Sequence, residues 1–90
     1  MAQAKGEVII RNKLGLHARP AMAFVDLASK FTSAIRVVKN DQVVDGKSIM
    51  QMLLLAATSG TKLTIEADGP DAAEALAGLA ALVKNRFEEE

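Results

Sequence analysis

Apolar and polar residues alternate over three short stretches, which predicts β-strands. The alternation is strict over 61–67, where Leu63, Ile65 and Ala67 share one face and the polar residues share the other. A strand of this kind has one face in water, which favours an antiparallel sheet. Residues 34–39 and 42–44 flank Asn40-Asp41, a good turn sequence, and are predicted to form a hairpin. A short apolar run over 7–11 predicts the first strand.

Three further stretches have the spacing of helices. The first helix follows the loop 12–16, has Pro20 in its first turn, and carries apolar residues at Ala21, Phe24, Val25 and Ala28. The second is expected to begin near Ser48, because Ser48 and Gln51 fit a Ser-x-x-Gln capping box, and to end at 58–60. The last opens at 68–71, and its predicted buried side consists of Ala72, Leu76, Leu79 and Val83.

The predicted order is therefore β-α-β-β-α-β-α. Because the sheet is half solvated, we expect an α+β open-faced sandwich, with a four-stranded antiparallel sheet and three helices on one face. The chain has 90 residues, which is enough for one modest core, and we expect a single domain over 1–90.

Composition removes several classes of function. The chain has no cysteine, which excludes a disulfide framework and a thiolate site, and its single histidine leaves no metal-ligand cluster. Eleven basic and eleven acidic residues balance, which disfavours nucleic acid. The longest apolar run, 52–57, is far shorter than a membrane span. We expect a cytoplasmic protein without metal or cofactor and without direct membrane binding.

His17 is the one side chain that titrates near neutral pH, and it lies between the loop 14–16 and the first helix. A histidine at a helix start is more often structural, but a helix N-terminus is also a natural anion site. Arg19 adds a guanidinium that can bind phosphate oxygens in pairs. No second histidine or close carboxylate pair is available for hydrolysis, so the available chemistry is to accept a group and pass it on.

Two motifs resemble those of a known family. Residues 12–21, Asn-Lys-Leu-Gly-Leu-His-Ala-Arg-Pro-Ala, resemble the active-site signature of HPr, the histidine-containing phosphocarrier family of the bacterial phosphoenolpyruvate-dependent phosphotransferase system. Residues 46–50, Gly-Lys-Ser-Ile-Met, resemble its second signature. The length of the chain and the order of its predicted elements agree with this family from about residue 7 to residue 86. No position of the two signatures departs from the family pattern.

The resemblance implies a carrier rather than an enzyme. His17 would accept a phosphoryl group on Nδ1 from phosphorylated enzyme I and give it to an enzyme IIA domain, and Arg19 would neutralise the group. Supporting roles fall to the N–H groups of Ala18 and Arg19, to the turn residues Gly15 and Pro20, and to Asn12, for which a plain turn role is almost as good an interpretation. A relay that meets two partners in turn through one face is expected to be a monomer.

Ser48 has two compatible interpretations. It fits the cap of the second helix, and the resemblance implies phosphorylation by a dedicated HPr kinase/phosphorylase, which would place about −1.5 to −2 charges there. The implied docking surface for the partners consists of Leu16, Ile49, Met50 and Leu53. Helical spacing cannot bury every apolar residue of 50–55, so some must remain exposed.

Other functions fit less well. An RNA-binding module of the same element order would need aromatic residues in its strands, but Phe24, Phe31 and Phe87 fall outside them. A P-loop would need glycine at position 41, which is Asp, and an acyl carrier would be all-helical and acidic. A nitrogen-type regulatory relay and a non-catalytic regulatory module stay open as alternatives.

The neutral net charge of the chain is an average over two unlike parts, because residues 1–47 carry eight basic and four acidic residues.

Overall fold

A computed structural model describes residues 2–88 of the chain and confirms the predicted order of elements. Its elements are β1 (Gln3–Ile9), α1 (Ala18–Ala28), β2 (Ala34–Lys39), β3 (Gln42–Asp45), α2 (Ile49–Leu54), β4 (Lys62–Asp68), α3 (Ala72–Lys84) and a short 3-10 turn, η1 (Arg86–Glu88). No helix among these residues is long and apolar enough to cross a membrane.

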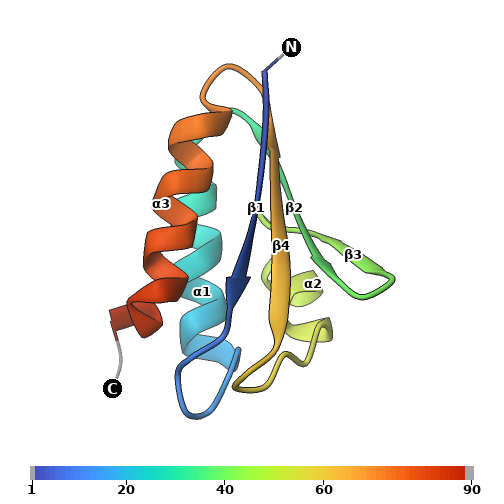
Figure 1. Ribbon diagram of the computed structural model, residues 1–90, viewed down its shortest axis with the longest axis vertical. Helices are drawn as coiled ribbons and strands as arrows, with labels where there is room; N and C mark the ends of the chain where they lie inside the picture. Colours follow the sequence, from blue (N-terminus) through green and yellow to red (C-terminus); the bar gives the residue numbers. More distant parts are fainter. Residues whose placement is uncertain (1, 89–90) are drawn as a thin grey trace.

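The four strands form one antiparallel sheet in the order β1-β4-β2-β3. All three α-helices cover one face of this sheet, and the other face is open (Figure 1). The open-faced α+β sandwich expected from the alternation in β4 is thus confirmed. The hairpin of β2 and β3 is confirmed as well, with Asn40 in a left-handed conformation at its turn.

The first strand differs from its prediction at both ends. Residues 7–11 were expected, whereas β1 covers Gln3–Ile9 and pairs along the whole of β4. Its first half lacks large apolar residues, and Gly6 lies against the side chain of Leu76 on α3, which is 3.4 Å from where a Cβ would stand. Ile10 leaves the ladder, is fully buried, and donates its N–H to the carbonyl of Thr61 at 2.9 Å.

The second helix is shorter than predicted. It was expected to continue to 58–60, but α2 ends at Leu54 and Ala56 adopts a left-handed conformation. Two side chains from the hairpin satisfy carbonyl groups at this end: Lys39 Nζ donates to Leu55 O at 2.8 Å, and Gln42 Nε2 donates to Leu54 O at 3.3 Å. These long-range donors stop the helix where its local sequence would continue.

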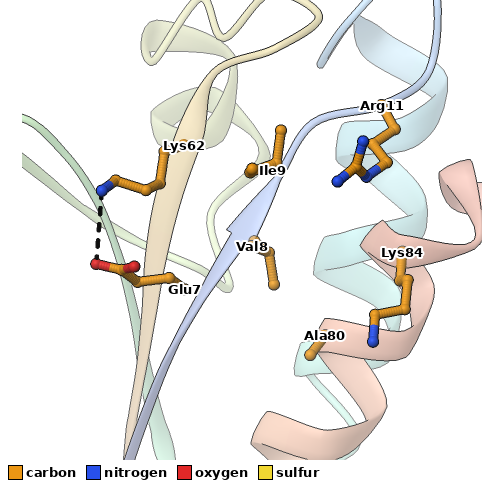
Figure 2. A pocket seen from close by; sticks show the side chains of 7 residues that line it. All are labelled: Glu7, Val8, Ile9, Arg11, Lys62, Ala80 and Lys84. Carbon is orange, nitrogen blue, oxygen red and sulfur yellow. Dashed lines mark ion pairs between the residues drawn. The ribbon is translucent and has the colours of Figure 1, made fainter.

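Charged pairs cover the open face of the sheet. Glu7 and Lys62 form an ion pair at 3.8 Å between β1 and β4 (Figure 2). Glu66 pairs with Arg36 at 3.2 Å across β4 and β2. Exposed pairs of this kind are worth little to stability, about 0 to 1 kcal/mol each. Together with them, this face exposes the apolar side chains of Ile9 and Val43.

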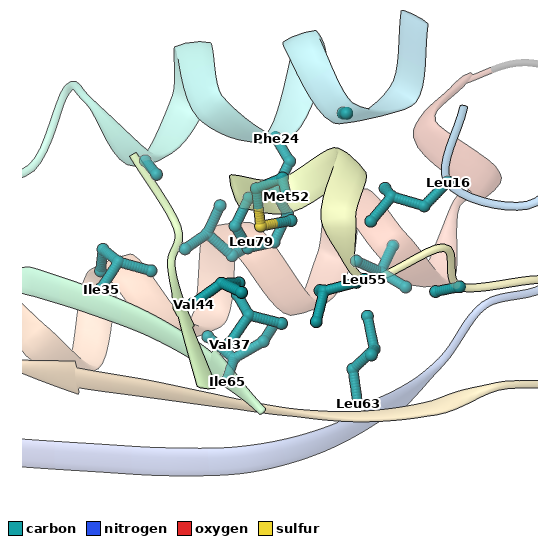
Figure 3. Close-up of a cluster of buried hydrophobic side chains, with 14 of the residues drawn as sticks. Leu16, Phe24, Ile35, Val37, Val44, Met52, Leu55, Leu63, Ile65 and Leu79 are labelled. Atoms are coloured by element: carbon teal, nitrogen blue, oxygen red, sulfur yellow. The ribbon is translucent and has the colours of Figure 1, made fainter. Parts of the chain in front are cut away.

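The core lies between the sheet and the helices (Figure 3). Phe24 of α1 and Met52 of α2 are almost completely buried against Val37 and Ile65 of the sheet. On α3 the buried residues are Ala72, Ala75, Leu79 and Val83. Leu76 was predicted to be among them, but it is only partly buried, because it lies toward β1 at the edge of the sheet.

Asp71 ties the start of α3 to the loop before β2. Its carboxylate accepts hydrogen bonds from the Ser33 hydroxyl, from the Thr32 N–H at 2.9 Å and from the Ser33 N–H at 2.9 Å. The hydroxyl of Ser33, followed by the Thr32 N–H, lowers the pKa of Asp71 to about 2. These bonds form only in the folded chain, so the charged form of Asp71 stabilises the fold.

We therefore expect Asp71→Asn to lower the free energy of unfolding at neutral pH. The folded pKa lies below the unfolded value of about 3.9, so the stabilisation is complete above about pH 4 and is lost as the pH falls toward about 2. The difference between wild type and variant should shrink over this window, as measured by urea denaturation. Asp26→Asn, at an exposed carboxylate on α1, is the control and should show no such window.

Candidate functional site

The loop between β1 and α1 is closed by its own hydrogen bonds. The Asn12 side chain is fully buried, and its Nδ2 donates to the carbonyl of Gly15 at 2.6 Å. The N–H of Gly15 donates back to the carbonyl of Asn12 at 3.1 Å. Gly15 has φ +73°, a conformation that glycine adopts at little cost. The motif residues Asn12 and Gly15 therefore shape the turn that leads into α1.

This loop is also fastened to the segment that follows α2. The N–H of Leu16 donates to the carbonyl of Ala57 at 2.8 Å. A Cβ on Gly15 would lie 2.5 Å from the same carbonyl oxygen and 2.9 Å from Thr58 Cα. Only glycine allows the two backbones to approach so closely at this point. Two segments distant in sequence thus meet directly before His17.

His17 is the N-cap residue of α1. Its backbone is extended, with φ −84° and ψ −169°, and its carbonyl accepts the N–H of Ala21 at 3.0 Å. The side chain is partly buried and makes no cap hydrogen bond to the helix. An N-terminal turn leaves its first N–H groups without carbonyl acceptors, and Pro20 has no N–H. The donors that open the helix are therefore those of Ala18 and Arg19.

The residues that open α1 have the chemistry expected of an anion site. Two N–H groups and the positive end of the α1 dipole favour a negative charge, and the exposed Arg19 adds a guanidinium. His17, Ala18 and Arg19 are consecutive at the start of α1, and the N–H of His17 donates to the carbonyl of Gly15 at 3.0 Å. Among residues 2–88 no group of three acidic or histidine side chains could hold a metal ion.

Ser48 caps α2 in the structure. Its backbone is extended, and its Oγ accepts the N–H of Gln51 at 3.2 Å. The capping box is only half formed, because the Gln51 side chain accepts the N–H of Asp45 at 2.9 Å instead of that of Ser48. The Ser48 N–H donates to the carbonyl of Asp45 at 3.1 Å.

The basic residue next to this serine, Lys47, is partly buried. Lys47 Nζ donates to the carbonyl of Phe31 at 2.7 Å, which anchors α2 to the end of α1. Lys47 is one of the eight basic residues of 1–47, and its contact in the fold is structural.

One predicted docking residue is not on the surface. Leu16 is only 4 % exposed and belongs to the core, because its backbone bond to Ala57 turns the side chain inward (Figure 3). Ile49 is partly buried, whereas Met50 is 73 % exposed and Leu53 is 39 % exposed. The expectation that some apolar residues of 50–55 stay exposed is confirmed.

Three further large apolar side chains are exposed near these elements, and the sequence reasoning missed two of them. They are Leu14 in the loop before His17, Met22 on α1 and Leu54 at the end of α2. For Met22 the signal was present, since it lies outside the apolar stripe of α1. For Leu14 the sequence carries no comparable pattern, whereas Leu54 belongs to the apolar run 50–55, part of which was expected to stay exposed.

Comparisons with known proteins show the family of the chain. A family model described as "PTS HPr component phosphorylation site" matches residues 4–85. The phosphocarrier protein HPr of Cupriavidus necator is 47 % identical over 83 residues, which cover 92 % of this chain and 93 % of that protein.

Solved structures agree as well. HPr of Thermoanaerobacter tengcongensis matches with a TM-score of 0.93 and 42 % identity, over 97 % of this chain and 98 % of that one. The Bacillus subtilis catabolite repression protein Crh, described as a domain-swapped dimer, matches with a TM-score of 0.76 and 46 % identity, over 96 % and 97 % of the chains.

The fold and these matches define a small α+β phosphocarrier protein of the phosphotransferase system. The chain belongs to the HPr family.

Two glycines test the contact between the loops. Gly15 and Gly60 both have positive φ, but a Cβ on Gly60 would meet nothing within 4 Å. We expect Gly60→Ala to cost about 1 kcal/mol of unfolding free energy, from its backbone conformation alone. Gly15→Ala should cost about 2 to 4 kcal/mol, because the methyl group also displaces Ala57. If urea denaturation shows equal losses of unfolding free energy for the two variants, the close approach of Gly15 to Ala57 is contradicted.

Proposed function

We propose that the chain relays a phosphoryl group from phosphorylated enzyme I to enzyme IIA domains through a phosphohistidine at His17. The position of His17 carries this proposal: it is the N-cap of α1, directly before two N–H donors and Arg19. The match to a family model for a phosphorylation site supports it. The chain would serve as a cytoplasmic carrier rather than as an enzyme with its own turnover.

The transfer step needs only a neutral imidazole. The lone pair of Nδ1 attacks phosphorus, a P–N bond forms, and the bond from phosphorus to the donor breaks, with its electron pair leaving on the donor. The proton stays on Nε2 throughout. The phosphorylated ring is therefore positively charged, and it becomes neutral again when the phosphoryl group is passed on. Fixed N–H groups at Ala18 and Arg19 and the guanidinium of Arg19 would balance the charge on the phosphoryl oxygens.

The same end of the molecule offers a surface for partners. The exposed side chains of Met50 and Leu53, with part of Ile49, form an apolar patch on α2, which packs beside α1. Flexible methionine side chains suit a surface that must fit several proteins. Enzyme I and the IIA domains would use this patch in turn, which a monomer serves best.

Ser48 is the proposed regulatory position. It caps α2 immediately before Ile49 and Met50, so a phosphate group there would border the apolar patch. The added charge of about −1.5 to −2 is tolerable at a helix N-terminus, but it would repel an acidic partner and hydrate the patch. An HPr kinase/phosphorylase would supply this modification.

Labelling with phosphoenolpyruvate and enzyme I tests the site. Wild type should gain a phosphate that is labile in acid and stable in base, whereas His17→Ala should gain none, because His17 is the only histidine. Arg19→Gln should slow the transfer about tenfold or more, since one charged donor is lost.

Arg36→Gln is the matched control for the arginine, because Arg36 lies on the open face and pairs with Glu66. Its transfer rate should stay within about twofold of wild type. Acid-labile labelling of His17→Ala would sink the assignment.

The regulatory proposal is tested by Ser48→Asp. A negative charge beside the patch should slow phosphorylation by enzyme I about tenfold or more, through weaker docking. Ser29→Asp adds the same charge at the other end of α1 and should leave the rate within about twofold. A Ser48→Asp protein phosphorylated as fast as wild type would show that this position does not control docking.

A further inference from the structure

A pocket of about 330 Å³ lies between β1 and α3, beside the edge of the sheet that β1 forms (Figure 2). Its lining residues are Glu7, Val8, Ile9, Arg11, Lys62, Ala80 and Lys84. None of them comes from α1, from α2 or from the turn 12–17. The pocket is therefore separate from the site built around His17 and from the patch on α2.

Three basic side chains and one carboxylate line this pocket. Glu7 and Lys62 pair with each other at 3.8 Å on one side of β1. Arg11 and Lys84 lie on the other side, toward α3, as Figure 2 shows. Within residues 2–88 neither Arg11 nor Lys84 has an ion-pair or hydrogen-bond partner. Two positive charges that are unpaired within the described part of the chain thus border one concave space.

The floor between these charges is apolar. Val8 points from β1 toward α3, where Ala80 lies (Figure 2). Ile9, which is 40 % exposed, extends the apolar lining along the strand. An apolar floor with charged groups at its rim offers an organic anion both kinds of contact, and about 330 Å³ is room for a small one.

We propose that this pocket binds a small phosphate monoester. Such an ester carries about two negative charges at neutral pH, which matches these two cations. The planar guanidinium of Arg11 can hold two phosphate oxygens, and the ammonium of Lys84 can neutralise the rest. The organic part of the ester would lie over Val8 and Ala80. This proposal does not depend on phosphorylation of His17.

A simpler role exists for one of the two cations. Lys84 lies in the last turn of α3, where a positive charge stabilises the helix end by about 0.3 to 1 kcal/mol. That role does not involve Arg11, which comes from the loop after β1, and it does not require a pocket. Binding measurements separate the two possibilities.

Phenyl phosphate is the probe for the test, at constant ionic strength and with amide NMR as the readout. We expect saturable shifts at Val8, Arg11, Ala80 and Lys84. Inorganic phosphate should bind at least about tenfold more weakly, because it lacks the apolar body, and phenol should not saturate. The double variant Arg11→Gln with Lys84→Gln should lose at least about tenfold in affinity.

A second double variant, Lys5→Gln with Lys30→Gln, removes the same charge at exposed lysines outside the pocket and should bind as wild type. The proposal fails if the control loses as much affinity as the pocket variant, since that would indicate general charge attraction only. It also fails if the shifts are confined to Ala18 and Arg19, because the anion would then occupy the His17 site. Equal affinity for inorganic phosphate and phenyl phosphate would overturn the ester as ligand.

Discussion

The hydrogen bond from the Leu16 N–H to the carbonyl of Ala57, 2.8 Å long, is the constraint on which the functional end of the molecule depends. It joins the loop before α1 to the loop after α2, and Gly15 lies against the same carbonyl because it has no side chain. The bond turns Leu16 into the core and leaves His17 at the start of α1. One carbonyl group thus links the packing of the core to the position of the predicted phosphoryl acceptor.

The start of α1, which follows this loop, presents few backbone N–H donors to a ligand. A helix begins with several N–H groups that lack acceptors, but Pro20 removes one and His17 O satisfies Ala21. The N–H groups of Ala18 and Arg19 remain, in fixed positions beside the imidazole. Because they are fixed before any ligand arrives, they need no reorganisation to stabilise a charge there.

Local signals in the sequence predicted most of the fold. Alternation identified β4, and the Asn40-Asp41 turn identified the hairpin, because these patterns follow from contacts between near neighbours. The prediction was wrong for the start of β1, since its first residues pair with β4 although they carry no large apolar side chains. The short α2 and the inward turn of Leu16 likewise depend on contacts with distant segments, which no local pattern records.

The most direct test of this account is amide NMR of the protein before and after phosphorylation by enzyme I. If a phosphoryl group on His17 is held by the start of α1, the amide protons of Ala18 and Arg19 should shift strongly downfield, because each would donate to a phosphoryl oxygen. Amides of the open face, such as that of Thr64, should not move. Unchanged Ala18 and Arg19 amides in a fully phosphorylated sample would contradict the account.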